Sequence, residues 1–205
     1  MSNKETEKLA EYLNCQSILE SQTSLLYRAL SDKVEIPLVK TLLKEIELDS
    51  QKHSILLNGV SSSIKQPNGK IKECQKNLLA LQTIIKLAKD FEEIDRFSLA
   101  DMQRLSEIFI TLESQMGEEY YMLVQMKTLE RMTAIINEQY SVDLTKIKSI
   151  FLKIIEDEER HIEILETIKQ LTAERKPDSS SPFVKFQNPD AWFQQTPLSY
   201  YATSP

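Results

Sequence analysis

The amino-acid sequence predicts an all-α protein built around an antiparallel four-helix bundle. Only three of the 205 residues are glycine and 41% are hydrophobic, which favours long helices around one core. Apolar residues recur at alternating steps of three and four, the spacing that keeps side chains on one helix face. These stripes predict four long helices and one shorter connecting helix, at about residues 3–31, 37–60, 98–139, 143–176 and 72–93.

Local signals mark the helix boundaries. Pro37 is acceptable in the first turn of the second helix, because an N–H has no helical acceptor there. Residues 61–70 contain a Pro-Asn-Gly run and predict a loop. Ser98 followed by Asp101 predicts the start of the third long helix. The fourth long helix must end before Pro177.

The chain divides into a bundle at residues 1–175 and a tail at residues 176–205. The tail holds five of the seven prolines, so it predicts no helix. It also holds six of the fifteen aromatic residues, which makes it too apolar for a typical disordered tail. We therefore expect it to pack against the bundle, a dimer mate or a separate protein partner. The residues predicted to dock are Phe183, Phe186, Trp192 and Phe193.

Charge and cysteine content narrow the functional classes. A net charge of −6 argues against a nucleic-acid or anionic-membrane partner. No apolar run approaches the length that spans a bilayer, and the first residues are charged. Cys15 and Cys74 form no CxxC pair, which excludes a zinc ribbon and a rubredoxin-type iron site. We expect reduced cysteines and a cytoplasmic location.

An internal repeat is the most specific feature of the sequence. A Leu-Glu-Ser-Gln segment at residues 19–22 recurs at residues 112–115, each followed five residues later by a tyrosine. The segment Asp-Ser-Gln-Lys-His at residues 49–53 matches Asp-Glu-Glu-Arg-His at residues 157–161. The two histidines of the chain therefore correspond, and the first pair of helices echoes the second.

Polar residues of the repeat interrupt the apolar stripes. Glu20, Glu113, Glu158 and His161 each have apolar residues one turn above and below them, which places them toward the bundle interior. A solvated face is the ordinary location of such residues, and their burial is costly. Convergent carboxylates and imidazoles become tolerable when divalent cations lie among them. The stripes therefore predict a metal site.

A glutamate on each of two helices and a Glu-x-x-His pair on the others is the ligand set of di-iron bundles. In this the chain resembles rubrerythrin and its relatives in the ferritin-like superfamily, over residues 3–172 without the insertion. The resemblance implies a ferritin-like bundle with an extra crossover helix and an irregular C-terminal tail. It implies as metal ligands Glu20, His53, Glu113, Glu158 and His161. It also implies that Tyr27 and Tyr120 are hydrogen-bond donors or redox-active neighbours of these ligands.

The chain departs from the family pattern at one ligand position. Ser50 stands where the repeat of Glu158 requires a carboxylate. Asp49 is a candidate replacement, because four residues before His53 is about 40° round the helix from it. Its shorter side chain is less suited to bridging two ions, so a mononuclear or an asymmetric dinuclear site stays open. Two iron ions are implied by the resemblance, and manganese and zinc remain possible.

Two functions follow from these residues. The first is a rubrerythrin-like di-iron oxidoreductase, of peroxidase or ferroxidase type, that reacts with peroxide or dioxygen and takes electrons from a separate protein. The second is a non-enzymatic ferritin-like binding or adaptor protein with a degenerate metal site and a partner-docking tail. Iron storage would need a shell of many subunits, for which the sequence gives no evidence. A homodimer formed through an exposed helix face is expected in either case.

Overall fold

The computed structural model describes residues 3–66, 70–125, 134, 136–138 and 147–173. This part of the chain is helical and contains no strand, which confirms the all-α prediction. The helices are α1 (Asn3–Asp32), α2 (Pro37–Ile64), α3 (Ile71–Asn77), α4 (Leu79–Glu92), α5 (Leu99–Gln125) and α7 (Ile147–Thr172). The predicted docking residues Phe183, Phe186, Trp192 and Phe193 lie outside the described residues.

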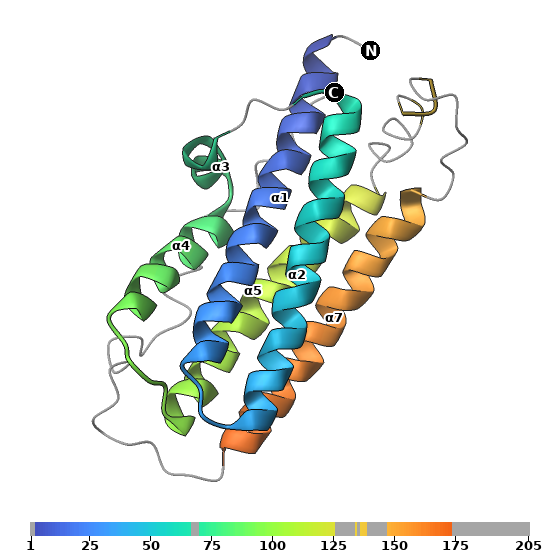
Figure 1. The fold of residues 1–205 in the computed structure, drawn as a ribbon. Coiled ribbons are helices and arrows are strands. Elements are labelled where there is room, and N and C mark those ends of the chain that lie inside the picture. The colour runs from blue at the N-terminus through green and yellow to red at the C-terminus, as the bar shows by residue number, and fades with distance from the viewer. Residues whose placement is uncertain (1–2, 67–69, 126–133, 135, 139–146, 174–205) are drawn as a thin grey trace.

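The four long helices lie alongside one another; α1 runs antiparallel to α2 and α5 runs antiparallel to α7, while α2 and α5 point the same way (Figure 1). Helix α1 packs against α2, α5 packs against α7, and α2 contacts α7. Helices α3 and α4 lie against α1 and lead from the end of α2 to the start of α5. Thus each half of the repeat forms a helical hairpin, and the two hairpins face each other.

The predicted helix starts at Pro37 and Ser98 are confirmed. Pro37 is the first residue of α2. At the start of α5, the backbone N–H of Ser98 donates to Asp101 Oδ2 at 2.9 Å, and the backbone N–H of Asp101 donates to Ser98 Oγ at 3.2 Å. This reciprocal capping satisfies two N–H groups that have no acceptor within the helix.

The insertion is two helices rather than the single helix expected at 72–93. The chain is extended at Leu78, where φ is −118° and ψ is 109°. Leu78 donates its N–H to the carbonyl of Cys74 and so ends α3, while its own carbonyl accepts from Gln82 in α4. Apolar spacing could not reveal this break, because Leu78 is itself buried and keeps the stripe continuous.

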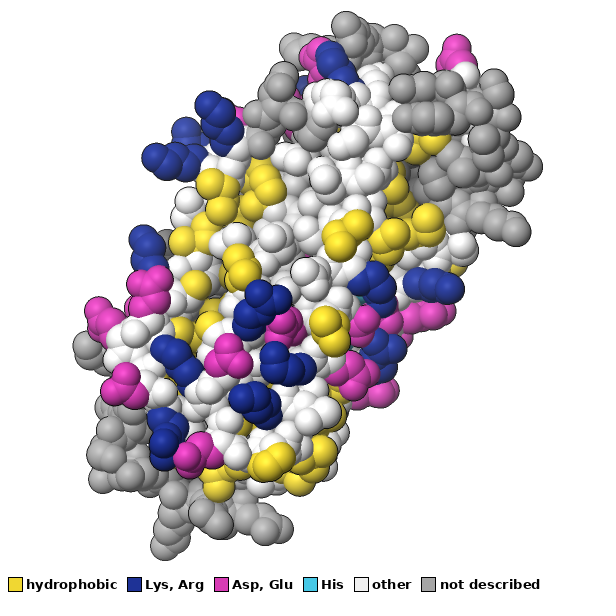
Figure 2. Space-filling view, viewed as in Figure 1, with side chains coloured by type: hydrophobic (Ala, Val, Ile, Leu, Met, Phe, Trp, Pro, Cys, Tyr) yellow, Lys and Arg dark blue, Asp and Glu magenta, His cyan; other side chains and the backbone are white. Residues whose placement is uncertain are grey.

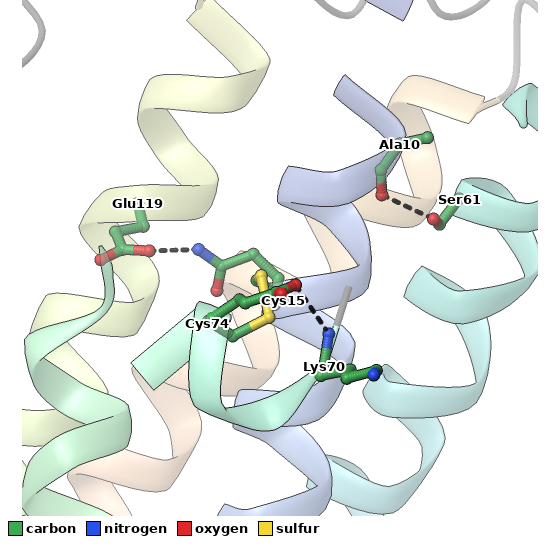
Figure 3. Close-up of a disulfide and its surroundings, with 8 residues drawn as sticks. Ala10, Cys15, Ser61, Lys70, Cys74 and Glu119 are labelled. Atoms are coloured by element: carbon green, nitrogen blue, oxygen red, sulfur yellow. Dashed lines mark hydrogen bonds between the residues drawn. A yellow bond between two sulfur atoms is a disulfide. The ribbon is translucent and has the colours of Figure 1, made fainter. Parts of the chain in front are cut away.

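The prediction of two reduced cysteines is wrong in this structure. Cys15 of α1 and Cys74 of α3 form a disulfide with an S–S distance of 2.03 Å (Figure 3). The absence of a CxxC pair carried no information about this bond, because its partners lie 59 residues apart. The disulfide ties the insertion to the bundle.

Reduction of this disulfide is expected to lower the free energy of unfolding by about 4 kcal/mol, because the bond closes a long loop in the unfolded chain. Urea denaturation with and without a thiol reductant measures the effect. The free energy of unfolding of the double variant Cys15→Ser/Cys74→Ser should not change when reductant is added. Equal stability of the oxidised and reduced wild-type protein would contradict the expectation.

The surface carries both signs of charge. Figure 2 shows one face, on which basic and acidic side chains are interspersed and hydrophobic side chains form several small groups. Large hydrophobic residues exposed in the described part include Leu25, Leu48, Ile55 and Tyr121. The homodimer stays a prediction. Among the described helices, none has the length and apolarity needed to cross a bilayer.

Candidate metal centre

The five residues that the family resemblance implies as ligands converge inside the bundle. Glu20 lies on α1, His53 on α2, Glu113 on α5, and Glu158 and His161 on α7. Each exposes 1% or less of its surface. Their positions in the apolar stripes explain this burial, since packing of the stripe turns every member toward the core.

Three of these residues form a first group. Nδ1 of His53 lies 3.6 Å from Glu20 Oε1 and 3.2 Å from Glu158 Oε1. One ligand atom from each residue lies within 4.8 Å of the other two. A cation placed among them would meet two carboxylates and one imidazole, each from a different helix.

A second group mirrors the first. Nδ1 of His161 lies 3.1 Å from Glu113 Oε2 and 3.8 Å from Glu158 Oε2. These three residues meet the same 4.8 Å limit. Glu158 belongs to both groups and turns one oxygen toward each histidine. The centroids of the two imidazole rings are 6.0 Å apart.

Unpartnered polar atoms gather at this place. In the described part of the chain, eight buried side-chain nitrogen or oxygen atoms have no hydrogen-bond partner, and six of them lie in these residues or in Ser50. The six are Glu20 Oε2, Ser50 Oγ, His53 Nδ1, Glu158 Oε1, Glu158 Oε2 and His161 Nε2. Buried polar atoms are rarely left unpaired. Carboxylate oxygens and imidazole nitrogens are donors suited to iron, manganese or zinc, so the donor set fits such ions.

In the absence of metal ions, protons on these residues would offset the charge of the buried carboxylates. Burial and then the charges of Glu20 and Glu113 raise the pKa of Glu158 to about 8. Burial alone would lower the pKa of His53, but the carboxylates of Glu158 and Glu20 raise it to about 10. Burial would likewise lower the pKa of His161, but the carboxylates of Asp49, Glu113 and Glu158 raise it to about 12. Metal binding must therefore displace protons from these groups.

The two tyrosines implied by the repeat bind the glutamates of the opposite hairpin. The hydroxyl of Tyr27 donates to Glu113 Oε1 at 2.6 Å, and that of Tyr120 donates to Glu20 Oε1 at 2.5 Å. Burial and these neighbouring carboxylates raise the pKa of both phenols. Both tyrosines thus remain neutral donors that fix the orientation of a carboxylate.

The outer nitrogens of the histidines face two aspartates. Nε2 of His53 lies 3.0 Å from Asp157 Oδ2. Nε2 of His161 lies 3.6 Å from Asp49 Oδ2, longer than a hydrogen bond. Asp49 belongs to neither group of candidate ligands. The structure thus places it behind His161, instead of at the ligand position that the sequence suggested for it.

A cation from each hairpin covers the two aspartates. Nζ of Lys52 lies 2.6 Å from Asp49 Oδ1 and 2.7 Å from Asp157 Oδ2. Arg160 pairs with Asp49 and lies 3.2 Å from Asp157 Oδ1. Sequence reasoning missed Asp157, Lys52 and Arg160 as parts of the site. The repeat contained this information, because Asp157 stands at the position equivalent to Asp49 and Arg160 at the position equivalent to Lys52.

Replacing Asp157 with asparagine is expected to weaken metal binding about 10–100-fold without changing the number of ions, because His53 loses the carboxylate that orients its ring. Competition against a chelator of known affinity measures the change. Glu156→Gln, an exposed neighbour on α7, is the matched control. An unchanged affinity would show that Asp157 only closes the surface.

No protein-family model, curated protein or solved structure matches the chain. What the site can do must therefore be inferred from its own residues.

Proposed function

We propose that this chain is a ferritin-like four-helix-bundle protein that holds two iron ions and reacts with peroxide or dioxygen. The observation that carries the proposal is the pair of buried ligand groups that share Glu158. The unpartnered Nδ1 of His53, Oε2 of Glu20 and both carboxylate oxygens of Glu158 support it, because cations would satisfy these atoms. The insertion, α3 and α4, is the proposed crossover connection between the hairpins.

Each side chain has a definite part in this proposal. Nδ1 of His53 and Nδ1 of His161 would each hold one ion, and Glu158 would hold both. Glu20 and Glu113 would each complete one position, with a tyrosine hydrogen bond fixing the carboxylate. Bound iron would supply the redox chemistry. Burial of these ligands keeps bulk water out and strengthens every electrostatic interaction among them.

A rubredoxin-type iron centre, which would relay electrons to the site, needs four cysteine ligands, and this sequence has two cysteines. The proposal therefore includes a separate protein as electron donor. Manganese or zinc would satisfy the same donors. Zinc would give a structural site or a hydrolytic one, because it does not change oxidation state.

The test is elemental analysis of protein purified without chelator, followed by anaerobic titration with ferrous iron and exposure to peroxide. We expect close to two ions per chain, consumption of peroxide, and the absorption of an oxidised iron pair. Metal content near zero, with no effect of iron on thermal stability, would contradict the proposal.

A second candidate is a metal-free binding or adaptor protein of the same fold. The observation that favours it is that the raised pKa values of His53 and His161 let two imidazolium ions neutralise the buried carboxylates. In that case deletion of residues 176–205 should abolish partner binding and leave the helical content intact. The metal titration above separates the two candidates, because an adaptor of this kind gains no stability from iron.

A further inference from the structure

Ser50 occupies a special place in the proposed centre. It precedes His53 by three residues on α2, as Glu158 precedes His161 by three residues on α7. Its surface is fully buried, and its Oγ has no hydrogen-bond partner. A hydroxyl in this position normally finds an acceptor. The missing acceptor therefore needs an explanation.

The contacts between the hairpins are reciprocal and indicate an approximate two-fold relation. Tyrosine of each hairpin binds the glutamate of the other, and histidine of each faces the aspartate of the other. Under this relation Ser50 is the counterpart of Glu158. Glu158 reaches both histidines, 3.2 Å from one Nδ1 and 3.8 Å from the other. Ser50 should thus face the same pair of ion positions from the opposite side.

Serine supplies no carboxylate at the position equivalent to Glu158. A glutamate side chain continues beyond its first methylene with a second methylene and a carboxylate, where serine ends in a hydroxyl. Because the serine hydroxyl stands at the position of that second methylene, the missing group is the carboxylate alone, which corresponds to formate, or to acetate if the neighbours give way.

With two divalent ions bound, the site would carry a net positive charge that an anion could neutralise. Two divalent ions bring four positive charges, and Glu20, Glu113 and Glu158 bring three negative ones. The two aspartates outside the histidines are matched by Lys52 and Arg160. One positive charge therefore remains in a site that excludes water, which is costly. A single monoanion would neutralise it.

We propose that the side of the centre next to Ser50 binds a small monocarboxylate, formate or acetate, which bridges the two ions and accepts a hydrogen bond from Ser50 Oγ. This inference rests on the proposed function, since it requires two bound ions. The bound carboxylate would be the sixth ligand of the centre, and the hydroxyl of Ser50 would donate a hydrogen bond to it.

The test uses the full chain loaded with cobalt(II), whose visible absorption reports its ligands. Titration with sodium acetate or sodium formate should change the spectrum saturably, with one anion per chain, and calorimetry on the zinc-loaded protein should give the same stoichiometry. Sodium chloride at equal ionic strength should have no such effect. Cobalt that binds without any response to either carboxylate would overturn the inference and leave the metal centre standing, whereas failure to retain metal would overturn both.

Two substitutions locate the anion. Ser50→Glu supplies the carboxylate covalently, so this variant should retain both ions and no longer respond to acetate. Gln51→Glu adds the same charge at the exposed neighbouring position and should respond as the wild type does. Ser50→Ala should retain the ions and bind acetate about tenfold more weakly, because a hydrogen bond to a charged acceptor is lost. Acetate binding of wild-type strength in both position-50 variants would place the anion elsewhere and overturn the inference.

Discussion

Replacing Glu158 with glutamine is expected to remove both metal ions, whereas replacing Glu113 with glutamine is expected to remove one. Glu158 belongs to both ligand groups, and Glu113 belongs only to the group of His161. A neutral amide of the same shape keeps the packing but loses the charge that offsets two cations. Metal content per chain, measured after equilibrium with a limiting free-metal buffer, distinguishes the two results.

The neighbouring Glu159 provides the matched control. It is exposed on α7, so Glu159→Gln changes the net charge equally without touching either group. Circular dichroism should show unchanged helical content for all three variants. Two ions retained by Glu158→Gln would be incompatible with a shared carboxylate and would require each ion to have its own ligands.

Metal binding is expected to release protons and to tighten as the pH rises. The pKa of Glu158 is about 8, that of His53 about 10 and that of His161 about 12. All three groups hold a proton at neutral pH in the metal-free protein, yet each must give it up to bind a cation. We expect release of roughly two or three protons per chain. A pH indicator in weakly buffered zinc titrations measures this number directly.

The stability of the metal-free protein should change in the opposite direction. Each histidine has a folded-state pKa above its unfolded value of 6.5, so its stabilising effect is complete below that pH and is lost as the pH rises through about 10 for His53 and about 12 for His161. Glu158 has a folded-state pKa above its unfolded value of 4.5, so its ionisation also destabilises the fold between about pH 4.5 and 8. The difference in Tm between zinc-loaded and metal-free protein should therefore widen with pH. A difference independent of pH would rule out proton displacement.

The repeat and the apolar stripes were sufficient to predict which ligands meet. Glu20 and Glu113 stand at matching positions in the first segment, and His53 and His161 at matching positions in the second. Equivalent positions on two helical hairpins converge when the hairpins pack face to face. The structure brings these residues together as that reasoning requires.

The place of Asp49 could not be predicted in the same way. Its angle round α2 set the direction of its Cα–Cβ bond only approximately. Which side chain meets its carboxylate depends on α7, whose Arg160 and His161 lie on the facing hairpin. Reading the repeat for charge as well as for ligands would have paired Asp49 with Asp157 and Lys52 with Arg160.

The insertion escaped prediction for a different reason. Periodicity reports which residues are buried, and Cys74, Leu78 and Leu81 are buried at helical spacing on either side of the break. It does not report a change of helix direction when an extended residue is itself part of the buried face. The disulfide escaped because a pairing across 59 residues depends on how the insertion packs against α1.

The reciprocal contacts also bear on how such a chain could arise. Tyr27 needs Glu113, Tyr120 needs Glu20, and the outer nitrogen of His53 needs Asp157. A single hairpin holds only one member of each pair, so alone it would bury these groups without partners. It could satisfy them only by joining a second copy of itself about a two-fold axis, where each contact is made twice. In its contacts the present chain is equivalent to such a dimer joined into one polypeptide, whose two halves are free to differ, as Ser50 and Glu158 do at equivalent positions.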